Sequence, residues 1–401
     1  MTPSGLLSTS EVAHRLGVRR ETVYAYVSRG MLERHEASGH RRSLFDPAAV
    51  EQLAVRARRG DRSGALDVVI ETRLTSLDPD GRLFYRGHDV MELARFRSFE
   101  QVAGLLWDGD PHAPWELEAR PAAVVARLRD ALDEETAAVE RLPVVVSGLG
   151  AADVRRGDRR PEAVRRAGAR MLAGSLDALP KPEEPADRSA AGRLWAALSE
   201  DGRPPRPAQR AALDSALVLL ADHELAASTL AARVAASAWA DPYRVVLAGL
   251  GALGGALHGA ASLSIESTLA ALQDPRMAFA VLQAQLAAGG AVPGFGHRVY
   301  RNRDPRADHL LARIASAAAD DVRARVVAAV VDAAGALDLP APNVDLALAG
   351  LCHAMRLRPG AASMIFSFAR IAGLLAHGLE EYPHRLRFRP RASYVGIAPR
   401  T

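Results

Sequence analysis

The 401-residue sequence contains a single cysteine, Cys352, and a single lysine, Lys181. One cysteine excludes an internal disulfide and a metal site built from cysteines, and it fits a reducing cytoplasm. Because Lys181 stands alone, 50 of the 51 basic residues are arginine, which looks like a coding preference shared by a whole genome. A lone arginine in this chain is therefore a weak indication of a binding site.

Long hydrophobic runs are also missing. No stretch of about 18 apolar residues occurs, so we expect no segment that spans a membrane. The first residues, "MTPSGLLSTSEVAHRLG", lack a basic segment followed by an apolar one, so we expect no secretory signal. A composition of 49% hydrophobic and 24% charged residues is that of a globular protein with two or three domains. We expect a cytoplasmic protein without a membrane partner.

The excess of positive charge is confined to one end of the chain. Residues 1–62 hold 11 basic and 7 acidic residues, whereas the remainder holds 40 of each. A polyanion partner is therefore favoured for the first segment alone.

Residues 6–58 have the pattern of two short helices, a hairpin and a third helix. Ser8 and Glu11 have the spacing of a capping box at the first helix. The second helix would span about residues 21–28, the "GHRR" stretch would form the hairpin turn, and Asp46 would cap the third helix. A small domain at the N-terminus is thus predicted.

This pattern resembles the winged helix-turn-helix of mercury-resistance-type regulators and excisionases, in "EVAHRLGV", "ETVYAYVSRGML" and "GHRRSLF". The resemblance implies that the second helix enters a DNA groove and that the wing contacts phosphates. The DNA-binding residues that it implies are Arg19, Arg20, Thr22, Tyr24, Arg41 and Arg42. The alternatives are a helical appendage with solvated arginines and a domain that contacts a protein. We expect this domain at 1–58 and a linker at 59–64.

Residues 65–401 predict a mainly α-helical fold. Short strand-like pieces flank the "DPDG" turn, Ser98 has the position of a helix cap, and helices dominate after residue 208. Residues 111–207 predict several amphipathic helices and show no pattern of catalytic residues. Many small residues in the later helices favour close packing in a large helical core.

Candidate catalytic residues gather in the second half of the chain. His223, His258 and His297 stand among small residues, in "ADHELAAST", "GGALHGAAS" and "PGFGHRVY". Each alone is more typical of a core histidine than of a catalyst. Asp345, in "APNVDLALAG", lies in an apolar stretch, where burial would raise its pKa and suit a general base. The alternative is that Asp345 caps a helix.

Arg370 lies inside the apolar helical stretch "FSFARIAGLLAHGLEEY". An unpaired charge buried there would be costly, so Arg370 needs an anionic partner from the protein or from a ligand. The few acids nearby in sequence are Glu380 and Glu381, which favours a ligand carboxylate. Two other arginines of interest, Arg306 and Arg389, stand in "DPRADH" and "RFRPRASYVG".

Several motifs occur in the order seen in citrate synthases: "GRLFYRGHDVMELA", "ADHELAASTLAARV", "GALHGAAS", "PGFGHRVYRNRDPRA", "NVD" and "RPRASYVG". The chain resembles this family over residues 66–401, most strongly after 220 and weakly from 107 to 207. The resemblance implies an all-helical fold with a large domain and an inserted small domain at roughly 225–335. It also implies acetyl-CoA and oxaloacetate as substrates, no cofactor or metal, and a homodimer or higher even oligomer.

The resemblance assigns a role to each candidate residue. Asp345 would remove a proton from acetyl-CoA, His258 would hydrogen-bond the thioester oxygen, and His297 would polarise the oxaloacetate carbonyl. The residues implied to bind oxaloacetate are His223, Arg306, Arg370 and, from the partner subunit, Arg389. The residues implied to bind CoA are Arg301, Pro293, Gly294, Phe295 and Gly296.

Two alternatives remain open. Synthesis of 2-methylcitrate from propionyl-CoA differs by one methylene, which a hydrophobic pocket distinguishes by only about 1–3 kcal/mol. The N-terminal extension is not part of the usual synthase pattern, and 107–207 looks shortened and rearranged. A DNA-binding regulator with a synthase-derived metabolite sensor is therefore the other hypothesis.

Overall fold

The computed structural model describes residues 6–16, 23, 27, 32, 35–36, 43–47, 49–50, 69–78, 81–112, 115–180, 185–255, 261–290, 292–297 and 299–389. The chain divides into two compact units, Met1–Glu71 and Thr72–Thr401. The linker predicted at 59–64 lies outside the described residues. So do these predicted site residues: His258, Arg19, Arg20, Thr22, Tyr24, Arg41 and Arg42.

The N-terminal unit contains a small antiparallel sheet and a helix. Its described elements are β1 (Leu7–Ser8), α1 (Thr9–Leu16), β2 (His35–Glu36) and β3 (Ser43–Phe45), with strand order β1-β3-β2. The capping box is confirmed, because the Ser8 hydroxyl accepts from the Glu11 N–H and the Glu11 carboxylate accepts from the Ser8 N–H at 2.7 Å. Val12, Val23 and Phe45 are fully buried in a small core.

The C-terminal unit begins with a three-stranded antiparallel sheet, in agreement with the strand-like pieces predicted around the "DPDG" turn. The strands are β4 (Thr75–Leu77), β5 (Leu83–Tyr85) and β6 (His88–Asp89). The Tyr85 hydroxyl donates to the carbonyl of Asp222 at 2.8 Å. This bond fixes the sheet to the segment after α10 that carries Asp222.

The remaining elements described in this unit are helices, which confirms the mainly α-helical prediction. The helices before residue 255 are α4 (Val90–Phe96), α5 (Phe99–Leu106), α6 (Ala119–Ala131), α7 (Ala138–Ala152), α8 (Pro161–Asp177), α9 (Ala190–Leu198), α10 (Pro207–Leu220), α11 (Ala227–Ser237) and α12 (Pro242–Leu253). The later helices are α13 (Ala261–Ala271), the 3₁₀ turn η1 (Pro275–Met277), α14 (Ala278–Ala287), α15 (Pro305–Ala317), α16 (Val322–Ala336), α17 (Val344–Ala354) and α18 (Ala361–Glu381).

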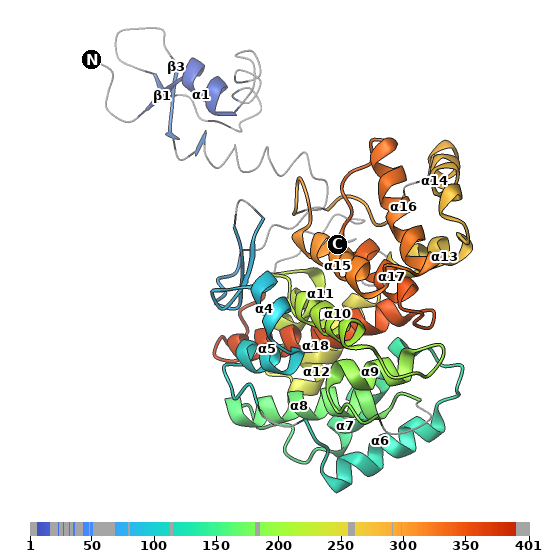
Figure 1. Cartoon of the computed structure of the whole chain (residues 1–401). Helices are drawn as coiled ribbons and strands as arrows, with labels where there is room; N and C mark the ends of the chain where they lie inside the picture. Colours follow the sequence, from blue (N-terminus) through green and yellow to red (C-terminus); the bar gives the residue numbers. More distant parts are fainter. Residues whose placement is uncertain are drawn as a thin grey trace, which may run out of the picture. The chain divides into compact units, whose positions relative to one another are not determined.

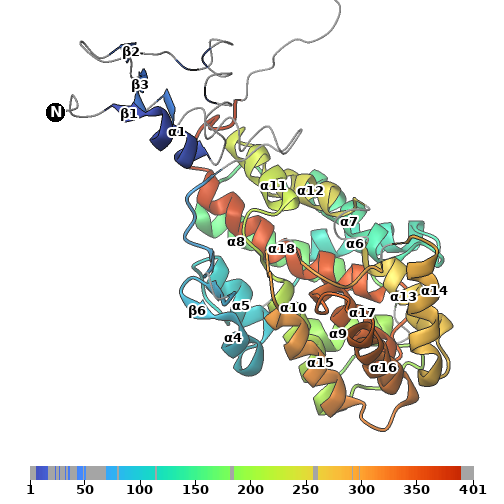
Figure 2. The same cartoon turned by 90° about the horizontal axis from the view of Figure 1, so that it is seen from above.

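Helix α18 runs through the middle of the C-terminal unit. Figure 1 shows α6–α9 on one side of it and α13–α17 on the other. Figure 2 shows α11 and α12 alongside its length, and both pack against it. The helix is long and apolar enough to cross a membrane by length and composition, but 94% of the tested window is buried inside the protein. It is the core helix of this unit.

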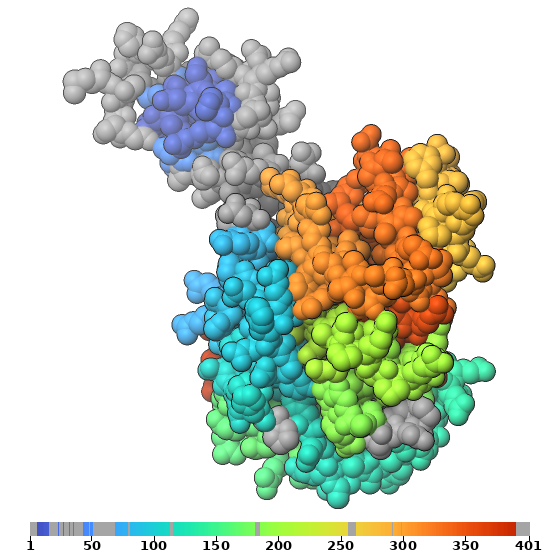
Figure 3. Space-filling model, in the orientation of Figure 1, coloured from blue at the N-terminus to red at the C-terminus, as the bar shows by residue number. Residues whose placement is uncertain are grey.

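Side-chain caps define the starts of three helices in this unit, α5, α15 and α17. Ser98 caps α5 in a capping box with Gln101, as the Ser98 position predicted. Asp304 caps α15, and Asn343 caps α17. In the space-filling view, the segments from α13 to α16 (yellow to orange) form one end of the C-terminal unit (Figure 3). The loop between α14 and α15 carries the glycine-rich turn predicted to present His297.

Candidate functional site

The glycine-rich turn is bonded to the segment that precedes α17. The N–H of Asn343 donates to the carbonyl of Gly294 at 2.9 Å, and the Asn343 side-chain amide donates to the carbonyl of Gly296 at 3.0 Å. The N–H of Gly296 donates to Ala341 at 2.8 Å. These bonds hold the turn beside the N-terminus of α17, so that His297 and Asp345 are carried by adjoining segments.

Both glycines of the turn are required by the backbone. Gly294 has φ +95° and Gly296 has φ +75°, a region that residues with a side chain rarely adopt. A Cβ on Gly294 would also lie 2.9 Å from the Cβ of Leu346. The turn therefore needs glycine for its own conformation, whether or not a CoA arm passes beside it.

The bonds of His297 define its tautomer. Its Nδ1 accepts from the backbone N–H groups of Val299 at 3.1 Å and Tyr300 at 3.3 Å. Burial and the nearby charge of Arg306 lower the pKa of His297, so the ring is neutral at pH 7. A neutral ring that accepts at Nδ1 carries its proton on Nε2. His297 therefore has its one N–H donor at Nε2. Arg306 Nη2 lies 3.4 Å from Nε2, but because a guanidinium only donates, the two groups do not hydrogen-bond each other in this tautomer.

A second histidine and a tyrosine join His297. The rings of His223 and His297 are 5.5 Å apart in an edge-to-face arrangement, and His297 and Tyr300 are 4.9 Å apart. The Tyr300 hydroxyl lies 3.2 Å from His223 Nε2. Burial, followed by the charges of Arg306 and Arg370, lowers the pKa of His223 well below its usual value. Two neutral imidazoles thus lie near the charge of Arg306.

Arg306 is buried against a carboxylate. Its Nε and Nη2 donate to the two oxygens of Asp304 at 3.0 and 2.8 Å, and both side chains are almost fully buried. Asp304 also accepts from the N–H of Val344 at 3.1 Å. Burial alone would lower the pKa of Arg306, but Asp304 and Tyr300 raise it above the usual value, so the guanidinium stays charged. Asp304 thereby connects Arg306 to the first turn of α17.

Asp345 lies in that first turn, but it is not the cap. The cap is Asn343, whose side-chain oxygen accepts from the N–H groups of Asp345 and Leu346. The alternative interpretation of Asp345 is therefore wrong. Burial raises the pKa of Asp345, with Arg306 acting in the opposite direction. A carboxylate with a raised pKa has the basicity that proton abstraction requires.

Arg370 is buried in α18, as its apolar context predicted. Burial lowers its pKa, and the acid that opposes this effect most is Asp222 rather than Glu380 or Glu381. A protein carboxylate that is distant in sequence therefore contributes to the environment of Arg370. Along an α-helix, Glu380 lies about 15 Å from Arg370, whereas Asp222 belongs to the segment that follows α10. The Arg370 Nε donates to the carbonyl of Leu220 at 3.0 Å.

The remaining predicted site residues make no described contact with His223 or His297. Arg301 and Arg389 are exposed, and no described contact joins Arg389 to the histidines of its own chain. Pro293 and Phe295 lie in the glycine-rich turn and are half-buried. Arg303, in the same motif, pairs with Asp308 at 2.7 Å. His258 belongs to the segment before α13 that lies outside the described residues.

Three further residues were missed by the sequence interpretation: Tyr300, Asp304 and Asp222. The first two stand inside the quoted motif "PGFGHRVYRNRDPRA" and the third directly precedes His223. An Asp-Pro pair at a helix start was the available signal for Asp304. Nothing local marks Asp222, because the groups that it contacts are distant in sequence.

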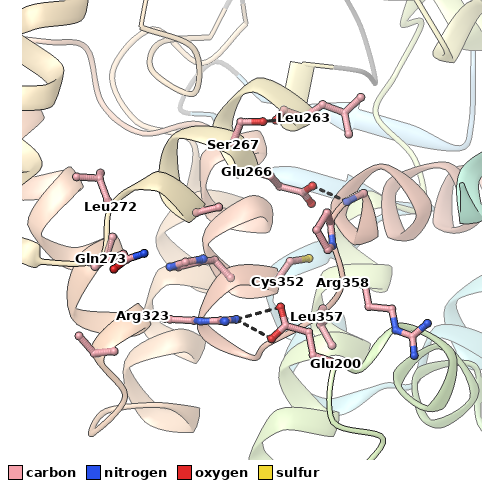
Figure 4. Close-up of a pocket in the computed structure, with 16 residues that line it drawn as sticks. Glu200, Leu263, Glu266, Ser267, Leu272, Gln273, Arg323, Cys352, Leu357 and Arg358 are labelled. Atoms are coloured by element: carbon pink, nitrogen blue, oxygen red, sulfur yellow. Dashed lines mark hydrogen bonds and ion pairs between the residues drawn. The ribbon is translucent and has the colours of Figure 1, made fainter. Parts of the chain in front are cut away.

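A separate cavity of about 550 Å³ lies at the other end of α17. Figure 4 shows Glu200 and Arg323, two of its lining residues, pointing toward each other, and they pair at 3.1 Å. Glu266 accepts from the N–H groups of Gly360 and Ala362 at the start of α18. None of the predicted site residues lines this cavity. Its charged groups are engaged with protein partners, so we do not assign the chemistry to it.

Comparison with known proteins gives a consistent result. A profile of the family "Citrate synthase, C-terminal domain" matches residues 66–391. Citrate synthase 2 of Bacillus subtilis is 31% identical over 356 residues, which cover 83% of this chain and 95% of the relative. The 2-methylcitrate synthase of Mycobacterium tuberculosis is 30% identical over 379 residues, covering 88% of this chain and 95% of the relative.

A solved structure is similar over the same part of the chain. It is the ternary complex of citrate synthase from Thermoplasma acidophilum with carboxymethyl coenzyme A and oxaloacetate, with a TM-score of 0.69 and 26% identity. The match covers 86% of this chain and 97% of the other. A family profile that spans most of the chain, relatives at 30% identity or more and the shared helical fold agree with the order of motifs: the chain belongs to the citrate synthase family.

Proposed function

We propose that the chain condenses acetyl-CoA with oxaloacetate and water to give citrate and CoA. The observation that carries this proposal is the convergence of His223, His297 and Arg306, with Asp345 on the adjoining helix turn. Cations beside neutral imidazole donors suit a dicarboxylate that carries a ketone. A partly buried carboxylate with a raised pKa suits the removal of a carbon-bound proton.

In the proposed mechanism, Asp345 takes a proton from the acetyl methyl group and His258 stabilises the enol at the thioester oxygen. The Nε2–H of His297 donates to the ketone of oxaloacetate and stabilises the alkoxide as it forms. Arg306 and Arg370 hold substrate carboxylates, His223 adds a further contact, and the partner subunit supplies Arg389. The protein would then act as a homodimer or higher even oligomer.

CoA would lie against the glycine-rich turn. Pro293, Phe295 and Gly296 are half-buried, Gly294 is buried, and Arg301, five residues after Gly296, is exposed. An exposed guanidinium next to this turn is suited to a CoA phosphate. A family member of this kind needs no cofactor, because acetyl-CoA is a substrate.

The activity is tested by thiol release from purified protein given oxaloacetate and acetyl-CoA. Release that depends on oxaloacetate supports a synthase. Folded protein that binds oxaloacetate and releases no thiol from any acyl-CoA would contradict the proposal and favour a metabolite sensor.

The second candidate function is 2-methylcitrate synthesis. It is kept because a citrate synthase and a 2-methylcitrate synthase are similar to this chain at nearly the same identity, 31% and 30%. The same assay with propionyl-CoA compares the two substrates directly. A larger kcat/KM for propionyl-CoA than for acetyl-CoA would assign the chain to 2-methylcitrate synthesis.

The pH dependence of kcat/KM should reflect Asp345. Because burial raises the pKa of Asp345 above the ordinary aspartate value of 3.8, the base should be lost by protonation at a higher pH than for an exposed aspartate. His223 and His297 have lowered pKa values and stay neutral, so no loss of activity is expected at the usual histidine value near 6.5. A pH–rate profile with acetyl-CoA measures this. An acid limb centred at 6.5 would contradict the assignment of neutral histidines.

We also propose that residues 1–58 form a DNA-binding domain joined by a linker at 59–64 to the synthase-like domain at 65–401, with the small domain at roughly 225–335. The three-stranded sheet and the helical positions at Val23 and Val27 support a winged helix-turn-helix arrangement. The proposed contacts are Arg19, Arg20, Thr22, Tyr24, Arg41 and Arg42. In a dimer, two such domains would favour a palindromic site.

An Arg41→Ala, Arg42→Ala double variant tests the wing. It should weaken DNA binding by removing two phosphate contacts and lower the salt dependence of affinity, while thiol release stays at the wild-type rate. Binding to a selected DNA site at two salt concentrations measures both effects. Unchanged affinity and salt dependence would exclude these two arginines from the interface.

A further inference from the structure

A chain of buried polar side chains runs behind Arg370. Asp222, Arg233 and His377 have no exposed surface. Asp222 Oδ2 lies 3.2 Å from His377 Nε2, and His377 Nδ1 lies 2.7 Å from Arg233 Nη1. Arg233 also donates to Glu381 at 2.9 Å and to Glu380 at 2.8 Å. The three central groups come from α11, from α18 and from the segment after α10.

The partners of His377 fix its tautomer. Arginine has only donors, so Arg233 must donate to Nδ1, and Nδ1 must carry no proton. The proton of the ring therefore sits on Nε2 and is donated to the Asp222 carboxylate. His377 is thus a neutral bridge: it satisfies one oxygen of a buried carboxylate without adding a positive charge beside it.

The segment that carries Asp222 contacts Arg370 directly, because the Leu220 carbonyl accepts from the Arg370 Nε at 3.0 Å. The Oδ2 atom of Asp222 accepts from His377 and from the Thr75 hydroxyl, whereas its Oδ1 has no hydrogen-bond partner among the described residues. The same segment is bound to α18 beside Arg370, because the N–H of Gly373 donates to Ala221 at 3.0 Å. A Cβ on Gly373 would lie 2.4 Å from Asp222 Oδ1, so carboxylate and helix are in close contact.

The outer end of the chain is anchored at the start of the C-terminal unit. Glu380 accepts from the Thr72 hydroxyl at 2.8 Å and from the N–H of Arg73 at 2.7 Å. With Arg233 held by Glu380 and Glu381, its guanidinium cannot turn away from His377. Each of these hydrogen-bonded side chains therefore fixes the orientation of the next one, from Thr72 through Glu380, Arg233 and His377 to Asp222.

We propose that His377 and Arg233 are positioning residues for the oxaloacetate site: by fixing Asp222, they hold the end of α10, whose Leu220 carbonyl keeps the guanidinium of Arg370 in the geometry that binds a substrate carboxylate. This inference rests on the proposed function in one respect, that Arg370 contacts oxaloacetate. Neither residue touches the substrate. Their effect should appear in substrate affinity rather than in the chemical step.

A pair of variants separates this role from a general packing role. In His377→Gln, the amide oxygen can accept from Arg233 and the amide N–H can donate to Asp222, so the bridge is retained. In His377→Leu, the volume is roughly kept but both bonds are lost. We expect His377→Leu to raise the KM for oxaloacetate at least tenfold, equivalent to about 1.4 kcal/mol, with kcat and the KM for acetyl-CoA within about threefold of the wild type. His377→Gln should stay within about threefold in all three.

Calorimetric measurement of oxaloacetate binding without acetyl-CoA tests the proposed function and the positioning role of His377 separately. Wild-type protein that does not bind oxaloacetate would contradict the proposed function. Wild-type protein that binds it while His377→Leu binds equally well would contradict the positioning role alone. Equal loss in His377→Gln and His377→Leu would also overturn it, because the amide should rescue the bridge.

A spectroscopic measurement is independent of whether His377→Leu folds. Nitrogen-15 spectra of histidine-labelled wild-type protein contain one ring signal that is absent in His377→Gln, which assigns it. We expect that signal to show an unprotonated Nδ1 and a protonated Nε2 at neutral pH. A proton on Nδ1, alone or together with one on Nε2, would overturn the proposed bridge.

Discussion

Asp345→Asn should lower kcat for thiol release by about a hundred- to ten-thousand-fold, the range for loss of a general base. Asparagine has nearly the same shape but cannot take a proton. The cap of α17 is Asn343, not Asp345, so the helix start should persist in the variant. Oxaloacetate affinity should change little, because the carboxylate acts on the acyl-CoA substrate. Steady-state thiol release and calorimetric binding of oxaloacetate measure the two effects separately.

Asp338→Asn is the matched control. Asp338 is exposed and lies shortly before the cap of α17. Asp338→Asn is the same chemical substitution outside the proposed site, so the variant should release thiol at the wild-type rate. If Asp345→Asn turned over at the wild-type rate, another group would have to be the base, and the proposed mechanism would be wrong. Loss of turnover together with loss of oxaloacetate binding would indicate a structural effect instead.

Local chemistry made much of this fold predictable. Ser98 with Gln101 and Ser8 with Glu11 form the capping boxes that their spacing indicates. These signals work because a cap and its partner lie within one turn of chain. The helical character after residue 208 follows in the same way from apolar residues that recur at helical spacing.

The candidate site was predictable only where a motif keeps its residues together. "PGFGHRVYRNRDPRA" contains His297, Tyr300, Asp304 and Arg306, which are in contact in the structure. The segment of Asp222 could not be connected to Arg370 from sequence, because the two residues are 148 positions apart and the packing of α10 against α18 brings their segments together. Glu380 and Glu381, the acids nearest to Arg370 in its own segment, pair with Arg233 on α11.

Arg306→Met should reduce both stability and substrate binding. The variant leaves Asp304 buried without its ion pair, and breaking a buried pair by removing one partner typically costs about 3–5 kcal/mol. It also removes a proposed carboxylate contact, so oxaloacetate binding should become undetectable by calorimetry. Arg303→Met is the control on the same segment: its partner Asp308 is exposed at the surface, and such pairs contribute about 0–1 kcal/mol. Thermal unfolding of both variants compares the two costs.

A double variant separates stability from binding. Asp304→Asn keeps a side-chain oxygen that can cap α15 while removing the negative charge that Arg306→Met leaves unpaired. Arg306→Met with Asp304→Asn should therefore unfold at a higher temperature than Arg306→Met alone, yet still fail to bind oxaloacetate. Recovery of binding along with stability would mean that Arg306 supports the site only through folding. If Arg306→Met instead unfolds like Arg303→Met, the buried pair with Asp304 does not carry the free energy assigned to it, and Arg306 acts on the substrate alone.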